Sequence, residues 1–345
     1  MKSFIHSLMT DRRNGAIWAP VKFLLFIASL LYFLGIVVRR VLYALRIFRS
    51  EKVPLKVVSV GNITLGGTGK TPFVMALARI YKESLRREPT ILIRGYGWDE
   101  QAMLKKNLPD NPILVGESRV RSAHKAIKLY GSDTSILDDG FQHWELVRDL
   151  DIVLVDSRNP FGNAQLFPRG ILREPVSSVR RAHVIVFTKV DKAAVNTDAL
   201  KSRLRNIKSD LIFLEAVHRP VHFYEMRTRK THGLDLVKGR KVMLLSSIGD
   251  PGYFEDTVKG LGAVVAGHIV FPDHHNYRKK DADRIIKICD EKSFDIVVTT
   301  DKDMVKLGRM SLSLGPYTII TLMVEMQILK GKEDLIDRLR RLYTH

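Results

Sequence analysis

The residue types best suited to chemistry lie in one glycine-rich run that follows a short β-branched segment at 55–60. The run reads Gly61-Asn62-Ile63-Thr64-Leu65-Gly66-Gly67-Thr68-Gly69-Lys70-Thr71-Pro72 and leads into an apolar stretch at 73–81. This is the sequence context of a P-loop, in which a strand is followed by a glycine-rich turn, by Gly-Lys-Thr and by a helix. Glycines let backbone N–H groups curl around phosphate oxygens, a lysine neutralises β/γ charge, and a threonine hydroxyl suits Mg²⁺. The residues that we predict to bind a nucleotide are Thr64, Gly66, Gly67, Thr68, Gly69, Lys70 and Thr71.

Acidic residues end the predicted strands that follow the P-loop. Asp138 and Asp139 come after the strand at 135–137, and Asp156 comes after the strand at 151–155. In open parallel sheets, ligands gather at the carboxyl ends of the strands. A strand that ends in an acid has the Walker B pattern, so we predict that Asp138 or Asp139 holds Mg²⁺, directly or through water. The alternative is that both are turn or helix-cap residues.

The tetrad Thr188-Lys189-Val190-Asp191 ends another predicted strand and is similar to the guanine-reading N-K-x-D box. Threonine occupies its first position, and Gly140 follows Asp138 by two residues where a D-x-x-G motif needs three. A solvated strand end explains the tetrad equally well, so we do not predict guanine specificity.

The motifs are spaced along an alternation of strands and helices, which predicts an α/β fold with parallel sheets. We predict a P-loop NTPase-like domain at 51–218, a basic linker at 219–240 and a smaller second α/β domain at 241–323. Because the second domain has no P-loop of its own, we expect it to supply substrate contacts or closure. The segment 324–345 contains a basic helix that we expect to pack back on the first domain.

The second half carries one further candidate site, the triplet Asp273-His274-His275. Two adjacent histidines beside an acid are compatible with zinc ligands, with a helix-entry turn and with an acid/base pair. In an acid/base pair, an aspartate keeps the imidazole oriented and its pKa useful near neutrality. The triplet alone does not distinguish these interpretations.

The first 50 residues differ in composition from the rest of the chain. They hold eight basic residues and one acid, Asp11, and an apolar run at 23–38 lies between Lys22 and Arg39. As a helix this run is about 24 Å long, which is shorter than the ~30 Å hydrocarbon core of a bilayer. A cleaved signal peptide needs a small-residue cleavage site, and a core helix needs a polar face; neither is found here. We therefore predict a membrane anchor over 1–50, either spanning the bilayer or dipping into one leaflet, with a basic helix at 41–48 on the headgroups.

The overall composition excludes several further classes of protein. The 345 residues carry a formal net charge of +19 and are 45% hydrophobic, which excludes a disordered or fibrous chain. The single cysteine, Cys289, excludes a disulfide framework and a multi-thiolate zinc site. Much of the excess charge flanks the apolar run, and no aromatic–basic RNA-binding motif is found. We therefore predict a lipid surface, and not a nucleic acid, as a partner.

Further motifs join the P-loop along the whole chain. In the first half they are Arg94-Gly95-Tyr96-Gly97, Asp138-Asp139-Gly140-Phe141-Gln142-His143, Phe161-Gly162-Asn163 and Pro168-Arg169-Gly170-Ile171-Leu172-Arg173-Glu174-Pro175. In the second half they are Ile248-Gly249-Asp250-Pro251, Phe271-Pro272-Asp273-His274 and Thr299-Thr300-Asp301-Lys302-Asp303. Together with the P-loop, in which the family also has a threonine at the position of Thr64, these motifs resemble the tetraacyldisaccharide 4′-kinase family, the lipid A kinases of Gram-negative bacteria.

The resemblance implies an enzyme that transfers the γ-phosphoryl group of ATP to the 4′-hydroxyl of a tetraacyl glucosamine disaccharide 1-phosphate, which gives lipid IVA. It implies two α/β domains that close over the nucleotide, with ATP and Mg²⁺ as cofactors. It also implies a place on the cytoplasmic face of the bacterial inner membrane. We expect the enzyme to be a monomer.

We add a hypothesis for the roles of single residues. Lys70 and the P-loop amides are expected to bind phosphates, Thr71 and Asp138 to place Mg²⁺, and Asp139 to assist that site. We expect Asp99 to take the hydroxyl proton. His274 is expected beside Asp99, with Asp273 orienting the histidine. Candidates for the substrate phosphate, each of which could equally be a surface charge, are Arg119, Arg169 and Arg173.

Two other functions remain open from the sequence. A P-loop NTPase of the metal-insertase or biotin-pathway type would hydrolyse or transfer phosphate without a lipid acceptor. A membrane-tethered nucleotide sensor would bind ATP with negligible transfer.

Overall fold

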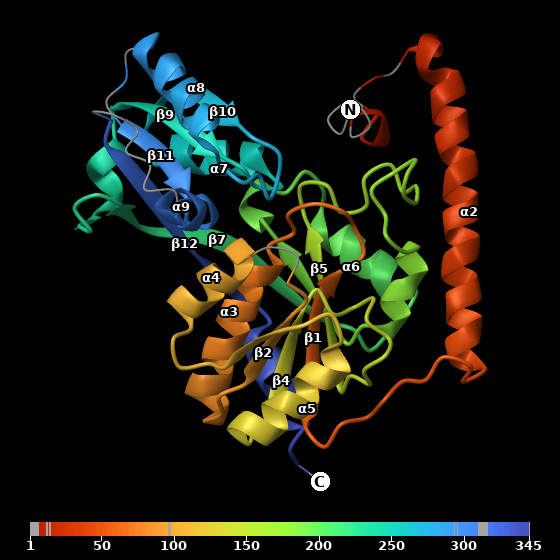
Figure 1. Cartoon of the computed structure of the whole chain (residues 1–345). Coiled ribbons are helices and arrows are strands. Elements are labelled where there is room, and N and C mark those ends of the chain that lie inside the picture. Colours follow the sequence, from red (N-terminus) through yellow and green to blue (C-terminus); the bar gives the residue numbers. More distant parts are fainter. Residues whose placement is uncertain are drawn as a thin grey trace. The chain divides into compact units, whose positions relative to one another are not determined.

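The chain forms two compact units, which Figure 1 shows in a computed structural model. The structure describes residues 7–11, 13, 15–95, 98–292, 294, 296–309 and 317–344. Unit 1 comprises Met1–Arg94, Asp110–Val217 and Gln327–His345, and unit 2 comprises Gly95–Pro109 and His218–Met326. Each unit is built on parallel strands and helices, so the predicted α/β class is confirmed. Two residues of the Arg94–Gly97 motif, Tyr96 and Gly97, lie outside the described residues.

The sheet of unit 1 is parallel, with the strand order β7-β6-β5-β1-β4-β2-β3. Its strands are β1 (Lys56–Asn62), β2 (Thr90–Ile93), β3 (Ile113–Val115), β4 (Thr134–Asp138), β5 (Leu150–Asp156), β6 (Val184–Thr188) and the first part of β7 (Ile212–Glu225). From β1 the chain builds β2 to β4 on one side, and it then crosses to build β5 to β7 on the other. The carboxyl end of β1 is therefore the switch point, where open α/β sheets bind their ligands.

The central strands of this sheet are buried along almost their whole length. Parallel strands are covered by helices on both faces, which explains why these segments read as continuous β-branched and apolar runs in the sequence. The helices of unit 1 are α2 (Ala19–Ala44), α3 (Lys70–Ile80), α5 (Arg119–Tyr130), α6 (Thr197–Arg205) and α10 (Lys332–Arg340). Shorter turns are η1 (Ala16–Trp18), η2 (Tyr81–Leu85), η3 (Val176–Arg181) and η4 (Val190–Lys192).

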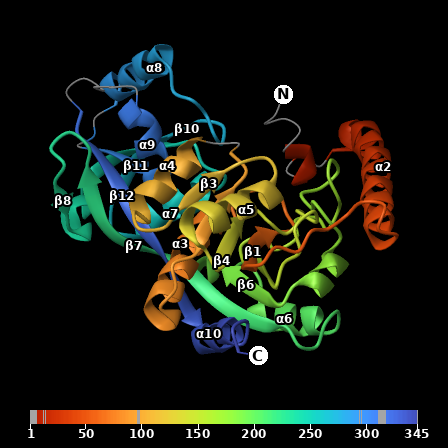
Figure 2. The same cartoon turned by 60° about the horizontal axis from the view of Figure 1, so that its bottom comes forward.

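Helix α10 ends close to the C-terminus (Figure 2) and belongs to unit 1. The hydroxyl of Tyr343, just after it, is hydrogen-bonded to the hydroxyl of Thr134 at the start of β4 (2.6 Å). The C-terminal segment thus contacts the P-loop sheet at the end of the strands that is opposite to the P-loop.

Helix α2 is the one helix in the described part of the chain that is long and apolar enough to cross a membrane. Its 26 residues give a length of about 39 Å, which exceeds the ~30 Å core of a bilayer. It is longer than the predicted apolar run because Arg39 and Arg40 continue the helix. Most of its apolar side chains are exposed, and Ser29 is its buried residue. The Ser29 hydroxyl and the Tyr32 hydroxyl donate hydrogen bonds to the carbonyls of Leu166 (2.9 Å) and Arg173 (3.0 Å).

Unit 2 has the strand order β10-β9-β11-β12-β7, with β8 antiparallel to β7. The strands are β8 (Thr231–His232), β9 (Lys241–Ser246), β10 (Val264–Val270), β11 (Ile296–Thr300) and β12 (Ile319–Lys330). The helices are α4 (Trp98–Asn107), η5 (Leu234–Val237), α7 (Pro251–Gly260), α8 (Lys279–Asp290) and α9 (Asp301–Arg309). Cys289 is buried in α8, as a small apolar residue would be.

The division of the chain differs from the predicted ranges in two places. Residues 95–109 were expected in the first domain, but they belong to unit 2, because α4 packs against α9. Residues 219–240 were expected as a linker, but they contain the second part of β7, β8 and η5. One strand was expected around 221–226, which agrees with the second part of β7, whereas β8 was not predicted.

Candidate active site

The P-loop of unit 1 connects the end of β1 to the start of α3, as the sequence predicts. Gly69 caps α3 with a φ of +85°, and Gly66 has a φ of +112°. Both values lie in the region that glycine adopts without steric cost, so these two glycines allow the loop its tight turn. Thr64 is buried, and its backbone pairs with that of Leu172. The first N–H groups of α3 have no partner within the helix, which makes its N-terminus a favourable site for an anion.

Two of the predicted metal ligands are in direct contact. The hydroxyl of Thr71, in the first turn of α3, donates a hydrogen bond to Oδ2 of Asp138 at the end of β4 (3.0 Å). Both side chains are buried. The contact follows from the sheet order, because β4 is the neighbour of β1 and its carboxyl end meets the P-loop.

The other predicted phosphate-site residues form an ion cluster. Asp139 accepts two hydrogen bonds from the Arg173 guanidinium (2.7 and 3.1 Å), and Nζ of Lys70 lies 3.7 Å from its Oδ1. Oδ1 of Asn62 accepts from Arg173 (3.1 Å) and from Lys70 (3.4 Å). Burial raises the pKa of Asp139, but the charge of Lys70 and the hydrogen bonds from Arg173 outweigh it and lower this pKa to about 2. Asp139 is therefore ionised at neutral pH, between two cations.

The three arginines that were predicted to bind the substrate phosphate have different partners in the structure. Arg173 contacts Asp139, whereas Arg119 is buried at the start of α5 and donates to the carbonyls of Gly116 (2.7 Å) and Asp138 (3.3 Å). Arg169 forms an ion pair with Asp11 (2.9 Å). This ion pair thus connects the loop that contains Arg169 to the segment that precedes α2.

Thr188 and Lys189 hold the P-loop from the end of β6, a contact that the sequence analysis missed. The Lys189 side chain is 2% exposed. Its Nζ donates to the carbonyl of Gly67 (3.0 Å) and to the carboxylate of Asp156. The Thr188 hydroxyl donates to the carbonyl of Thr68 (3.1 Å). From the sequence, a solvated strand end explained the tetrad at 188–191 equally well, because the burial of a lysine cannot be read from the tetrad itself.

We predict that Lys189→Met weakens ATP binding about tenfold or more. The loss removes a charge-assisted hydrogen bond to the P-loop backbone, a type of bond that contributes roughly 1.5–3 kcal/mol. Titration calorimetry with ATP measures the effect, and Lys192→Met, at an exposed position in η4, is the matched control. Equal ATP affinity in the Lys189→Met variant and the unmodified protein would show that the P-loop keeps its shape without this bond.

A second cluster of charged side chains surrounds Asp99 in unit 2. Oδ2 of Asp99 lies 3.3 Å from Nδ1 of His274, 3.4 Å from Nζ of Lys306 and 3.8 Å from Nζ of Lys302. The Asp99 side chain is 3% exposed, whereas that of His274 is 43% exposed. The predicted neighbourhood of Asp99 and His274 is therefore present within unit 2.

Asp273, which was expected to orient His274, has its shorter contact with Lys302, and His275 has a different carboxylate as its partner. Oδ1 of Asp273 accepts from Nζ of Lys302 (2.9 Å) and from the backbone N–H of His274 (3.0 Å), while its Oδ2 is 3.8 Å from Nε2 of His274. His275 lies 3.0 Å from Asp281. The two adjacent histidines thus face different carboxylates. His274 itself has a φ of +59°, a conformation that is uncommon outside glycine and found at functional sites.

A buried network supports the lysine that contacts Asp99. Nζ of Lys306 donates to the hydroxyl of Ser247 (2.6 Å) and lies 3.5 Å from Oδ1 of Asp303. The fully buried Asp303 carboxylate accepts from Ser247, from Tyr277 (3.1 Å) and from Thr300 (2.7 Å). Polar networks that are this fully hydrogen-bonded hold their members rigidly. The roles of Lys302 and Lys306 were not predicted from the sequence, although their spacing of four residues on α9 places them on one helix face.

The contacts around Asp99 shift the pKa values of the pair in opposite directions. Burial raises the pKa of Asp99, but the hydrogen bond from His274 and the charges of Lys302 and Lys306 outweigh it and hold this pKa well below its usual range. The hydrogen bond to Asp99 raises the pKa of His274, although burial and Lys302 oppose the change. The Asp99 carboxylate is therefore ionised at neutral pH.

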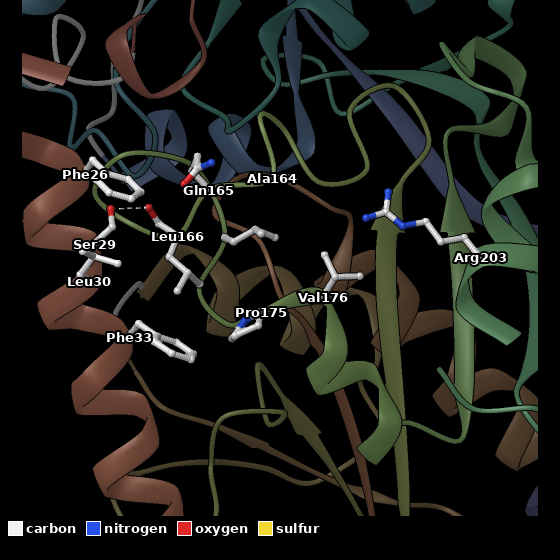
Figure 3. A pocket seen from close by; sticks show the side chains of 11 residues that line it. Phe26, Ser29, Leu30, Phe33, Ala164, Gln165, Leu166, Pro175, Val176 and Arg203 are labelled. Atoms are coloured by element: carbon white, nitrogen blue, oxygen red, sulfur yellow. Dashed lines mark hydrogen bonds between the residues drawn. The ribbon is translucent and has the colours of Figure 1, made fainter. Parts of the chain in front are cut away.

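An apolar pocket of about 410 Å³ lies between α2 and the loop at 164–176 (Figure 3). Its lining residues are Phe26, Ser29, Leu30, Phe33, Ala164, Gln165, Leu166, Leu172, Pro175, Val176 and Arg203. Figure 3 shows the rings of Phe26 and Phe33 on the side of α2 that faces Leu166 and Pro175. The pocket could not be predicted from the sequence, because its two walls are more than 130 residues apart in the chain.

The chain was compared with protein families and with known proteins, and both comparisons point to one family. The family model for tetraacyldisaccharide-1-P 4′-kinase matches residues 21–344. The tetraacyldisaccharide 4′-kinase of Syntrophus aciditrophicus is 33% identical, over 92% of this chain and 93% of that protein. The tetraacyldisaccharide 4′-kinase of Halothermothrix orenii is 36% identical, over 90% of this chain and 89% of that protein.

Among solved structures, the crystal structure of LpxK from Aquifex aeolicus in complex with ATP matches with a TM-score of 0.72. The two chains are 28% identical, over 94% of this chain and 100% of that chain. Since the family model covers the P-loop, both charged clusters and almost the whole chain, this protein belongs to the tetraacyldisaccharide 4′-kinase family.

Proposed function

We propose that this protein transfers the γ-phosphoryl group of ATP to the 4′-hydroxyl of a tetraacyl glucosamine disaccharide 1-phosphate, which gives lipid IVA. The observation that carries the proposal is the match of the family model over residues 21–344, which include the P-loop of unit 1 and the Asp99 cluster of unit 2. We also propose that the enzyme acts as a monomer.

Unit 1 is proposed to bind Mg-ATP. The N-terminus of α3, the P-loop amides and Lys70 hold the phosphates. The hydroxyl of Thr71 and the carboxylate of Asp138 fit Mg²⁺, because both are hard oxygen donors and they lie 3.0 Å apart at the end of the P-loop. When bound, Mg²⁺ neutralises charge that develops on the transferring phosphoryl group. Asp139 holds Lys70 and Arg173 beside this site.

The acceptor side is proposed to use the Asp99–His274 pair and one arginine. The pair in unit 2 receives the proton of the 4′-hydroxyl, and Lys302 and Lys306 keep Asp99 ionised. Arg173 is the strongest candidate for the substrate phosphate, since it shares the Asp139 carboxylate with Lys70 of the P-loop. Arg119 and Arg169 are instead assigned to holding their own loops, because carbonyls and Asp11 occupy their guanidinium groups.

Helix α2 is proposed to place the enzyme on the cytoplasmic face of the bacterial inner membrane. Its exposed apolar side chains and its basic flanks suit a bilayer with anionic headgroups. We propose that the pocket beside α2 accepts an acyl chain of the substrate, since its lining is mostly apolar and one wall belongs to the helix.

The deciding experiment is a transfer assay with the full chain in detergent micelles. The protein is incubated with Mg-ATP and radiolabelled tetraacyl disaccharide 1-phosphate, and a doubly phosphorylated lipid is expected. Release of phosphate that ignores the lipid would favour a different P-loop NTPase. ATP binding without either reaction would favour a nucleotide sensor.

The proposed binding of an acyl chain in the pocket beside α2 can be tested by mutation. Leu30→Glu places a charge in the pocket, so we expect the KM for the tetraacyl substrate to rise about tenfold. This corresponds to lost contact with roughly two methylene groups at about 0.8 kcal/mol each. Leu24→Glu adds the same charge to α2 outside the pocket lining, so it controls for weaker membrane binding. An equal rise of KM in both variants would mean that the pocket does not hold an acyl chain.

A further inference from the structure

We propose that the hydroxyl of Tyr32, on helix α2, positions the guanidinium of Arg173 in the phosphate site. Tyr32 is then a positioning residue, and α2 is a structural part of the active site as well as an anchor. The role assigned to Tyr32 rests on the proposed function, since Arg173 is the arginine that is proposed to contact the substrate phosphate.

The hydroxyl groups of α2 lie on the face of the helix that is turned toward unit 1. Between residues 24 and 38, the buried or partly buried side chains are those of Leu25, Ala28, Ser29, Tyr32 and Ile36. Their spacing of three or four residues places them on one face, and the apolar residues around them are exposed. Transfer of a hydroxyl into hydrocarbon costs free energy, so a helix that served only as an anchor would gain nothing from these two polar groups.

Both hydroxyl groups are hydrogen-bonded to the same loop of unit 1. Ser29 donates to the carbonyl of Leu166 (2.9 Å; Figure 3) and accepts from the backbone N–H of Arg169 (2.9 Å). Tyr32 donates to the carbonyl of Arg173 (3.0 Å). Helix α2 thus holds this loop at two points, and the second point is the residue whose side chain enters the phosphate site.

The backbone of Arg173 is held from two sides. Its N–H donates to the carbonyl of Ile63 (2.7 Å), at the start of the P-loop, and its carbonyl accepts from Tyr32. A hydrogen bond on each side of one residue fixes the place of its Cα atom, from which the side chain must reach the site. Without the hydroxyl of Tyr32, the bond to Ile63 holds this backbone from one side only.

The guanidinium of Arg173 depends on such a fixed backbone. It donates two hydrogen bonds to Asp139 (2.7 and 3.1 Å) and one to Oδ1 of Asn62 (3.1 Å). Bidentate bonds of this kind require a defined geometry. In an active site, a misplacement of about 1 Å can cost 10²-fold in rate. A looser backbone at residue 173 is therefore expected to weaken the contact between Arg173 and the substrate phosphate.

The ring of Tyr32 has a contact of its own, which makes a selective variant available. The ring packs edge-on against Phe167, with 5.7 Å between the ring centroids. Tyr32→Phe keeps the ring and the apolar surface of α2 and removes only the hydroxyl. The variant therefore tests the hydrogen bond to Arg173 and leaves the membrane anchor intact.

The test measures lipid phosphorylation by the full chain in detergent micelles. Tyr32→Phe is expected to lower kcat/KM for the tetraacyl substrate about three- to tenfold, which is the size of one neutral hydrogen bond. The affinity for ATP, measured by calorimetry, is expected to stay the same, because Lys70 and the P-loop amides keep their contacts. Binding to vesicles of phosphatidylethanolamine and phosphatidylglycerol, measured by flotation, is also expected to stay the same.

Tyr43→Phe is the matched control, because it removes a hydroxyl from the same helix about 16 Å further along its axis. There the ring of Tyr43 packs against Phe48 and Trp144. This variant is expected to keep the kcat/KM of the unmodified enzyme. The proposal is overturned if Tyr32→Phe also keeps that value, or if it loses ATP affinity or vesicle binding to the same extent as kcat/KM.

A double-mutant cycle shows whether Tyr32 acts through Arg173. Arg173→Ala alone is expected to lower kcat/KM for the lipid about tenfold or more, since it removes charge-assisted hydrogen bonds. Addition of Tyr32→Phe to this variant is expected to cause little further loss, because the guanidinium that the hydroxyl positions is gone. Equal losses from Tyr32→Phe in both backgrounds, or full activity of Arg173→Ala, would overturn the proposal.

A readout without turnover separates this proposal from the proposed function. Hydrogen exchange of the peptide that covers residues 163–176, followed by mass spectrometry, is expected to be faster in Tyr32→Phe than in the unmodified protein and in Tyr43→Phe. Unchanged exchange would overturn the role of Tyr32, whether or not the protein phosphorylates the lipid. Faster exchange in a protein that never phosphorylates the lipid would instead contradict the proposed function.

Discussion

Lys70→Ala is expected to lower the rate of lipid phosphorylation by about 10²–10³-fold. Lys70 supplies a positive charge at the N-terminus of α3, where the β- and γ-phosphates are proposed to lie. Removal of a single preorganised donor from a developing negative charge costs factors of this size in other enzymes. The fold should survive, because Asp139 keeps its two hydrogen bonds from Arg173 after the lysine is removed. Initial rates at varied ATP concentration measure kcat and KM together.

The control for this variant is Lys82→Ala, which removes an exposed lysine of unit 1 that pairs with Asp110 (2.7 Å). Its rate should stay close to that of the unmodified enzyme, since exposed ion pairs contribute little. A Lys70→Ala enzyme that phosphorylates the lipid within threefold of the parent rate would contradict the proposed nucleotide site.

Asp138→Ala is expected to lower the rate by two to three orders of magnitude and to raise the Mg²⁺ concentration that gives half of the remaining rate. A bound metal stabilises transition-state charge by several kcal/mol, and each 1.36 kcal/mol is a tenfold change in rate. The variant also leaves the hydroxyl of Thr71 without the carboxylate that it contacts. Titration of activity with Mg²⁺, after removal of metal with EDTA, measures both effects.

Asp110→Ala is the matched control for Asp138→Ala, because it removes the exposed partner of Lys82. Its Mg²⁺ titration should match that of the unmodified enzyme. An Asp138→Ala enzyme with an unchanged Mg²⁺ requirement would assign the metal to other residues, and Asp139 would be the next to test.

The P-loop could be predicted from the sequence because its signals are local. The β-branched run of β1, the glycines and the start of α3 follow one another within about 25 residues, and each element has its own periodicity and composition. The pairing of Thr71 with Asp138 also followed, since the Walker B pattern places an acid at the end of a strand and the sheet brings strand ends together. Helix α4 was missed because its charged residues give it no clear apolar face.

The surroundings of Asp99 could not be predicted in the same way. Its contacts come from α4, from the loop after β10 and from α9, which are separated by some 200 residues of chain. Lys302 lies in the motif at 299–303 but was given no role of its own, and Lys306 carries no local mark that distinguishes it from a solvated lysine. Arg169 was expected to be either a contact to the substrate phosphate or a surface charge, but its guanidinium is paired with Asp11.

The sequence by itself determined the family, the α/β class, the phosphate loop and the apolar N-terminal helix, because each depends on residues that are neighbours in the chain. Only the tertiary structure decided which side chains are buried, which charges are paired and which of two adjacent groups faces the solvent. Burial and long-range pairing depend on the packing of a whole unit. These two properties shift the pKa values of Asp99 and His274, the pair that is proposed to serve the acceptor hydroxyl.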